Sequence, residues 1–326
     1  MLQNLGASIG GIISLVLNVT RNYRGSVSRA TYIVLMTIMC LGGPFALALP
    51  AAHQVQRTDG RKVILGRSPN ITSEFAIFWK LLKHPTVLAT LPLMLYAQWF
   101  LGYQWQFNFA YFTVRARALN SMLFYLLGFV ASFLLGQFLD WQRFTRKTRA
   151  RVGCLIVFFS VGISWIIGQA VQVRYAKTLP TLDWADEGFG LGCFVFVLWG
   201  VSDPLVTTYK YWVFGTLTNN VNEAAYVAAL INSVGSVGST LGFVIGKMKF
   251  SLVGACAINL TLFFLSMPGL FWVVWTRVTE TSHGTSLVGY VPGHDLEGDG
   301  HGSGEDSPVE HVRDLSGKSV TEKTVV

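Results

Sequence analysis

Long apolar runs constrain the fold of this chain more than any other feature. About six of them lie between residues 86 and 275, and about two more lie between Leu2 and Ala52. A bilayer core about 30 Å thick is crossed by roughly 20 apolar residues of helix. Backbone groups in lipid find partners only within a helix or a closed barrel, and these runs are too long and too apolar for barrel strands. The sequence therefore predicts an all-α polytopic membrane protein.

The composition agrees with an integral, multi-pass membrane protein. Hydrophobic residues make up 52% of the chain and charged residues 13%, which is about half the charged share of a soluble domain. The formal net charge of +8 would suit nucleic acid, but the basic residues flank apolar runs, where membrane proteins place them. We therefore expect the lipid bilayer as a partner and no nucleic acid.

The chain divides into four parts. Residues 1–52 hold two spans, at 2–19 and 31–52. Residues 53–85 form a polar connection, whose stretch 73–83 has apolar side chains at helical spacing; it is either an amphipathic helix at the interface or an extension of the next span. Residues 86–276 hold six spans, at 86–112, 118–139, 152–173, 188–209, 223–246 and 252–276. Residues 277–326 have too few apolar side chains to build a core, and we predict a disordered tail.

The distribution of Lys and Arg predicts the orientation. With about eight alternating spans, the 53–85 connection, the 140–151 loop, Lys210 and Arg277 belong to one face, which carries about 13 basic residues against about nine on the other. Basic residues concentrate on the cytosolic side of membrane proteins. We therefore expect both termini and the 53–85 connection in the cytosol.

No catalytic, metal or cofactor motif occurs in the sequence. HExxH, GxSxG and Walker patterns are absent, and the six histidines all lie outside the predicted spans. We therefore expect no enzymatic activity and no cofactor.

Asp203 is the one clear acidic residue inside a predicted span. A charge in lipid is costly, and such residues usually face a bundle interior or a wet cavity. Asp203 either contacts a solute, cation or proton, or makes a structural bond to a neighbouring helix. Pro204 follows it and frees backbone carbonyls one turn upstream.

The third span interleaves aromatic residues with amides, among them Gln104 and Asn108. This pattern suits a cavity wall, and it also suits a packed helix with an interfacial aromatic belt. On the seventh span, Gly238, Gly242 and Gly246 recur every four residues, which lets helix backbones approach closely. We interpret this glycine face as packing within the chain rather than as a dimerisation surface.

Four motifs follow one another along the chain. Residues 4–13 are rich in glycine, and residues 107–120 end in Arg-Ala-Arg-Ala-Leu-Asn. Residues 136–147 carry Gly-x-x-x-Asp followed by basic side chains, and residues 200–219 carry Asp, Tyr-Trp and Gly-x-Leu. In this order and spacing they resemble the Unc-93-like branch of the major facilitator superfamily, as found in fungi. The matching residues are Arg115, Arg117 and Asn120 in an outer turn, Gly136, Asp140, Arg143 and Arg146 in a loop motif, and Asp203, Tyr211 and Trp212.

The resemblance implies a major-facilitator-type bundle that is shortened at its N-terminus. It begins at the family's fifth helix, so that 86–276 corresponds to a complete C-terminal six-helix half and 1–52 to the last two helices of the other half. It also implies that the loop motif latches neighbouring helices at the cytosolic face. The family often has Lys and Gln in the helix after Tyr-Trp, whereas Asn232 and Gly235 stand there in this chain, which weakens the case for a coupling charge at that place.

Two functions follow from the resemblance. One is transport of a small solute or ion by rocking of two halves around a central cavity, for which we expect Asp203, Tyr211, Trp212, Asn108 and Gln104 to line the site. The other is a non-transporting subunit that regulates or escorts another membrane protein, which would then be a partner.

Overall fold

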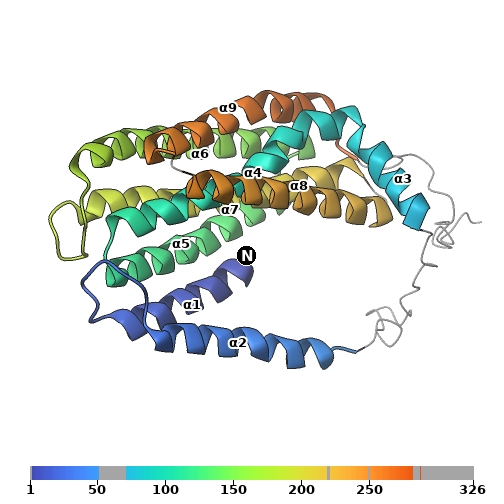
Figure 1. Ribbon diagram of the computed structural model, residues 1–326. Helices are drawn as coiled ribbons and strands as arrows, with labels where there is room; N and C mark the ends of the chain where they lie inside the picture. The colour runs from blue at the N-terminus through green and yellow to red at the C-terminus, as the bar shows by residue number, and fades with distance from the viewer. Residues whose placement is uncertain (1, 51–70, 219–220, 249, 282–286, 288–326) are drawn as a thin grey trace, which may run out of the picture. The chain divides into compact units, whose positions relative to one another are not determined.

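The chain folds into helices throughout its described part. The computed structural model describes residues 2–50, 71–218, 221–248, 250–281 and 287, and within these ranges it holds no strand beyond one isolated bridge. The helices (Figure 1) are α1 Leu2–Asn18, α2 Arg29–Leu47, α3 Ile71–Leu82, α4 Pro85–Tyr111, α5 Val114–Asp140, α6 Arg146–Thr178, α7 Phe189–Leu217, α8 Val221–Lys247 and α9 Leu252–Thr276. The predicted all-α polytopic fold is confirmed.

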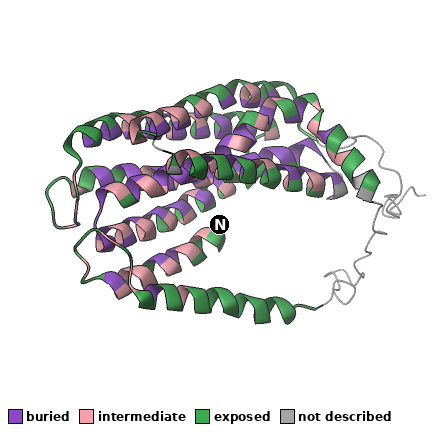
Figure 2. Ribbon diagram, in the orientation of Figure 1, coloured by how far each residue is buried: buried purple, intermediate pink, exposed green. Residues whose placement is uncertain are grey.

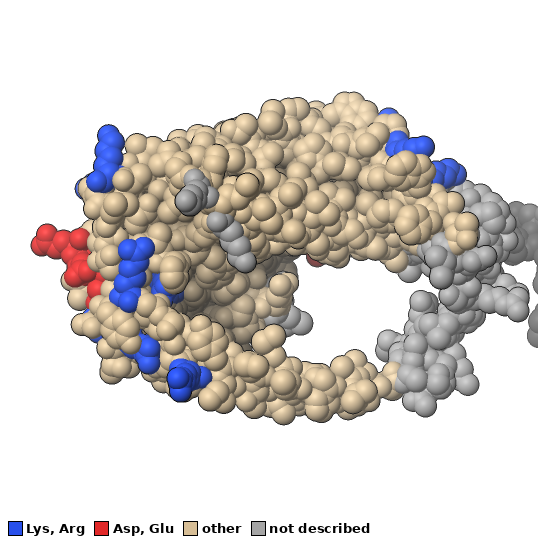
Figure 3. All heavy atoms as spheres, in the orientation of Figure 1, with Lys and Arg blue, Asp and Glu red and all other residues tan. Residues whose placement is uncertain are grey.

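Six of these helices, α2 and α5 to α9, are long and apolar enough to cross a membrane. α1 has 17 residues, and α4 has 27 residues with amides interleaved among its apolar side chains. Figure 3 shows Lys and Arg gathered toward the two ends of the helices, with a broad uncharged surface between them. This is the surface of an integral multi-pass membrane protein.

The helix starts follow from local capping. Ser28, Thr113, Thr145 and Ser251 each accept a hydrogen bond from a backbone N–H in the first turn of the next helix. The α3 helix ends at Leu82, and Pro85 starts α4 because its missing N–H is no loss at a first helical position. The helix predicted over 73–83 is therefore a separate element rather than an extension of the next span.

The core lies among α4 to α9. α4 packs against α8 and α9, α6 packs against α7 and α9, and α5 packs between α7 and α1. Figure 2 shows buried positions along α4 and α7, whereas α2 is exposed along most of its length. At Gly238 and Gly242 a side chain would collide with the backbone carbonyls of Leu95 and Trp99, so the glycine face of α8 lies directly on α4.

The face of α4 that carries Tyr103 and Phe107 is packed rather than open. Tyr103 and Phe107 contact the rings of Trp165 and Trp199 on α6 and α7 at centroid distances of 5.2–5.8 Å. Gln172 of α6 accepts a hydrogen bond from the Tyr103 hydroxyl. This face fits the packed-helix interpretation of the third span.

The predicted boundaries differ most at two helices. α6 begins and ends about five residues outside its predicted span of 152–173, and α7 continues to Leu217, well past residue 209. The α6 extensions are rich in Lys and Arg, and the α7 extension begins with Lys210, so hydropathy falls there although each helix continues. Most of the 53–85 connection, namely residues 53–70, and the predicted tail beyond residue 281, apart from residue 287, lie outside the described residues.

Candidate functional site

A cavity of about 370 Å³ lies among α1, α4, α5, α7 and α8. Gln3 and Asn4 of α1 line it, and α7 contributes the largest share of its wall. Its lining is both polar and apolar. The side chains with polar groups include Gln3, Asn4, Gln98, Tyr125, Ser132, Asp203, Thr207, Thr208, Lys210, Tyr211 and Asn232, and the apolar ones include Phe100, Trp105 and Phe124.

Asp203 lies in this cavity wall on α7 and is 7% exposed. One of its carboxylate oxygens, Oδ2, has no hydrogen-bond partner among the described residues. Gln104 of α4 lies beside it, fully buried, with both amide atoms likewise lacking a well-formed hydrogen bond within the described part. A buried polar group without a partner is costly, and such groups in native proteins usually have a functional explanation.

Lys210 lies on the same wall, two helical turns after Asp203. Its side chain is 2% exposed, and its ammonium group lies 5.1 Å from the centroid of the Tyr211 ring. The sequence analysis counted Lys210 with the cytosolic face, just past a span predicted to end at residue 209. α7 continues for seven residues beyond Lys210, so the residue lies within the helix.

Tyr211 and Asn232 close one side of the cavity. The Tyr211 hydroxyl donates a 2.8 Å hydrogen bond to Oδ1 of Asn232, which joins α7 to α8. Asn232 is the residue that stands where the Unc-93-like pattern has a Lys. The polar group at this position is therefore held by a tyrosine of the Tyr-Trp motif.

The other predicted cavity residues lie elsewhere. Trp212 stacks with Tyr209 at 6.5 Å and lies beside Arg149 of α6. Asn108 accepts a hydrogen bond from Asn120 and donates one to the Arg117 carbonyl. The structure thus brings Asp203, Gln104 and Tyr211 together at or beside the cavity and places Trp212 and Asn108 outside it.

The predicted outer turn, Arg115 to Asn120, binds two loops. Arg115 contacts Asp183 of the α6–α7 loop at 2.5 Å, and Arg117 donates to the Gly25 carbonyl of the α1–α2 loop. The resemblance assigned these residues to an outer turn without naming their partners. Arg117 binds a carbonyl of the α1–α2 loop, and the main partner of Arg115 is a carboxylate that sequence analysis missed.

Asp183 is buried under this turn and 7% exposed. The Arg115 guanidinium lowers the pKa of the Asp183 carboxyl from 3.8 to about 2, against the opposing effect of burial and with help from the Thr113 hydroxyl at 2.6 Å. Asp183 is therefore ionised at any physiological pH. In the sequence Asp183 stands close to two other acids, Asp186 and Glu187, and nothing there distinguishes it from them.

The loop motif makes different contacts from those the resemblance implies. Asp140 ends α5 and is exposed, as is Arg143, and within the described ranges neither makes an ion pair. Gly136 has open space where a side chain would stand. The backbone N–H groups of Arg146 and Lys147 instead donate to the Glu280 carboxylate, which follows α9. An acid thus does meet the basic loop, but it comes from the end of α9.

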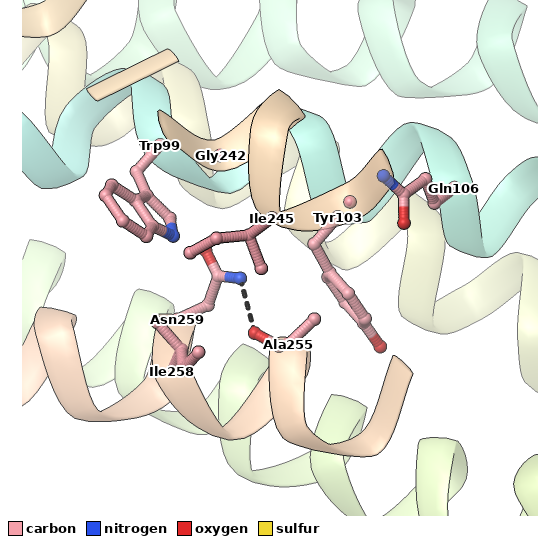
Figure 4. Close-up of a pocket in the computed structure, with 9 residues that line it drawn as sticks. Trp99, Tyr103, Gln106, Gly242, Ile245, Ala255, Ile258 and Asn259 are labelled. Atoms are coloured by element: carbon pink, nitrogen blue, oxygen red, sulfur yellow. Dashed lines mark hydrogen bonds between the residues drawn. The ribbon is translucent and has the colours of Figure 1, made fainter. Parts of the chain in front are cut away.

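A second, water-sized cavity of about 10 Å³ lies between α4, α8 and α9 (Figure 4). Asn259 points into it and donates a 2.8 Å hydrogen bond to the Ala255 carbonyl of its own helix. Its Oδ1 atom has no partner among the described residues. The space is sufficient for about one water molecule, so it is a packing feature and too small for a solute.

Sequence analysis did not assign Lys210, Asn232, Thr207 or Thr208 to the cavity. Gln98 is one of the amides interleaved on the third span, for which a cavity wall was one of two interpretations. The signal for Lys210 was available, because residues seven apart share one face of a helix and Asp203 had already been singled out. Gln98 and Thr207 are polar residues in apolar runs and carried the same signal more weakly. No sequence pattern placed α1 at the cavity.

Curated relatives match most of the chain. Notoamide biosynthesis cluster protein O' of Aspergillus versicolor is 30% identical over 318 residues, which cover 97% of this chain and 67% of that protein. An UNC93-like protein of Schizosaccharomyces pombe is 29% identical over 289 residues, covering 86% of this chain and 57% of that protein. UNC93-like protein 1 of Arabidopsis thaliana is 27% identical over 281 residues, covering 84% of this chain and 61% of that protein.

This chain therefore spans about two thirds, or less, of the length of these relatives. No protein-family model matches it. No solved structure matches it either.

Proposed function

Because the chain belongs to the UNC93-like family of membrane proteins, we propose that it takes part in moving a small solute or ion across the membrane. The Asp203 cavity is the site at which that solute binds. In this proposal α4 to α9 form one six-helix half of a major-facilitator-type transporter, and α1 belongs to the other half. Rocking of the two halves would expose the cavity to each side of the membrane in turn.

The observation that carries the proposal is that Asp203 lines the cavity and makes no ion pair among the described residues. The neutral amide of Gln104 lies beside its carboxyl group. A carboxylate kept for packing alone would normally be paired, because an unpaired one costs stability without a return. A cavity of about 370 Å³ at the same place offers room for the missing partner.

Flux measurements in liposomes test the proposal. Radiolabelled rubidium, acetate and alanine serve as probes for cations, anions and zwitterions. We expect the protein to carry at least one of them faster than protein-free liposomes, and Asp203→Asn to lower that rate about tenfold, the effect of losing one charge-assisted hydrogen bond. Glu187→Gln, which removes an exposed acid from the α6–α7 loop, is the matched control. Equal rates for wild type and Asp203→Asn would contradict a role of the cavity in transport, and Asp203 would then have a structural role.

A second candidate is a non-transporting subunit that regulates or escorts another membrane protein. It is favoured by α2, in which Thr31 is the one buried residue of 19. An exposed apolar helix can contact another membrane helix as well as lipid. A protein that carries none of the three probes, and whose tagged form co-purifies with a second integral membrane protein in a ratio fixed across detergents, would favour this candidate.

A further inference from the structure

We infer that the cavity binds a small zwitterion, a molecule with one ammonium and one carboxylate group such as a free amino acid. The inference rests on the proposed function and adds the chemical class of the solute. Its basis is that an acid and a base, Asp203 and Lys210, both line the same cavity without binding each other.

The spacing of the two residues suits a ligand between them. Seven residues of α-helix span about 10 Å and return to the same face. A salt bridge needs the charged atoms within about 4 Å, and the ion pair found among the described residues is Arg115 with Asp183, not Asp203 with Lys210. Both side chains line the cavity, so a ligand within it can contact the two charged groups together.

Both charged groups need an external partner. Lys210 is 2% exposed. Its ammonium group lies over the Tyr211 ring and makes no ion pair within the described ranges. Asp203 keeps a carboxylate oxygen without a partner. A buried charge without an ionic partner is costly to the folded protein. A ligand that pairs both groups removes two such costs at once.

This charge balance separates the candidate ligand classes. A lone cation would pair with Asp203 and leave Lys210 buried without an anion. A lone anion would do the reverse. A zwitterion oriented with its ammonium group at Asp203 and its carboxylate at Lys210 pairs both, and the ligand remains neutral overall.

The rest of the lining suits such a molecule. Gln98, Thr207 and Thr208 face the cavity and offer both donors and acceptors. Phe100, Trp105 and Phe124 supply apolar surface for a carbon side chain. The volume of about 370 Å³ exceeds what a small amino acid requires, which leaves space for bridging waters.

Ligand-dependent thermal stability of the full chain in lipid nanodiscs tests the inference. The probes are two zwitterions, alanine and γ-aminobutyrate, together with butylammonium and butyrate, which each keep one of the two charges. A ligand that binds only the folded state raises the unfolding midpoint. We expect at least one zwitterion to bind about tenfold more tightly than either singly charged probe, since each probe lacks one charge-assisted bond.

Two variants assign the charges. Asp203→Asn and Lys210→Met should each abolish the tighter binding of the zwitterion relative to the singly charged probes. Lys210→Met should also weaken butyrate binding, and Asp203→Asn should weaken butylammonium binding. Glu187→Gln and Lys177→Met remove exposed charges of the same sign and should leave the zwitterion shift unchanged. A variant that does not fold is replaced by Asp203→Glu or Lys210→Arg, which keep the charge and should keep a weakened preference for the zwitterion.

Three results would overturn the inference. In the first, butylammonium stabilises the protein as much as a zwitterion does, and Lys210→Met leaves both shifts unchanged. In the second, butyrate stabilises it as much as a zwitterion does, and Asp203→Asn leaves both shifts unchanged. In the third, neither zwitterion shifts the unfolding midpoint. The flux assay separates this inference from the proposed function. Zwitterion binding without flux would contradict transport alone, whereas rubidium flux without zwitterion binding would contradict the zwitterion alone.

Discussion

Asp183 is the residue that joins the most distant segments at the outer turn. Its carboxylate accepts hydrogen bonds from Thr113 and Arg115, and Arg115 also reaches the carbonyl of Val19 at the end of α1. The α1–α2 loop, the α4–α5 turn and the α6–α7 loop thus share one ionic centre. A single neutralising change should therefore loosen all three connections.

Asp183→Asn should lower the thermal unfolding midpoint at pH 7 by a few degrees, because Asn cannot accept a charge-assisted bond from Arg115. The pKa of Asp183 is lowered from 3.8 to about 2 by Arg115. A lowered pKa means that the carboxylate stabilises the fold fully above about pH 4, and that this contribution disappears as the pH falls through about 2. Tryptophan fluorescence melts of both proteins between pH 7 and pH 2 measure the difference.

Glu187→Gln is the control for Asp183→Asn, since Glu187 lies in the same loop and is exposed. Its melting curve should follow that of the wild type at every pH. A difference between Asp183→Asn and wild type that persists unchanged at pH 2 would show that the carboxylate charge is not the cause.

Arg117 differs from other arginines near the outer end of the helices. Its guanidinium donates to the Gly25 carbonyl and lies 4.8 Å from the Phe109 ring centroid, whereas Arg174 of α6 is exposed. Arg117→Ala should lower the yield of folded, monodisperse protein several-fold, because the loop carbonyl and the exposed Phe109 ring both lose their partner. Fluorescence-detected size exclusion compares it with Arg174→Ala. Equal yields would argue against a structural role for the turn.

At the scale of whole helices, the contact between α4 and α8 depends on glycine. A Cβ atom at Gly238 would collide with the Leu95 carbonyl, whereas a Cβ atom at Gly215 on α7 would stand in open space. Ala is favoured over Gly in a helix interior by up to about 1 kcal/mol. Gly215→Ala should therefore leave the unfolding midpoint unchanged or raise it, while Gly238→Ala should lower it despite the same gain. Higher midpoints for both variants would show that α4 and α8 are not in close contact.

The helices were predictable because each buries its backbone within an apolar run, and such runs stand out in the sequence. Asp203 and Tyr211 were identifiable at the cavity for a similar reason, since polar residues inside apolar runs are few. Lys210 was counted with the cytosolic face and not with the cavity, because hydropathy falls before α7 ends at Leu217. Asp183 escaped notice because its role depends on a contact with Arg115, which is 68 residues away in the sequence. Contacts of that kind arise from packing and have no local signature.

At the scale of the molecule, the alternation of the helices places the connections at two ends. The α5–α6 loop and the α3–α4 connection lie at one end, and the α4–α5 turn and the α6–α7 loop lie at the other, as Figure 1 shows. The stretch from Arg143 to Arg151 holds five basic residues and no acid. The α6–α7 loop holds three acids, Asp183, Asp186 and Glu187. The positive-inside rule then places the α5–α6 loop in the cytosol, which stays a prediction.

Single cysteines introduced into a cysteine-free background test this orientation with an impermeant maleimide. Gln142→Cys lies in the α5–α6 loop and Glu187→Cys in the α6–α7 loop, and both native side chains are exposed. In sealed membrane vesicles with their cytosolic face outward, we expect Gln142→Cys to react at once and Glu187→Cys only after detergent is added. Vesicles of the opposite sidedness should reverse the pattern, which controls for intrinsic reactivity. Labelling of Glu187→Cys alone on the cytosolic face would invert the orientation, and labelling of both on one face would contradict the alternation of α6.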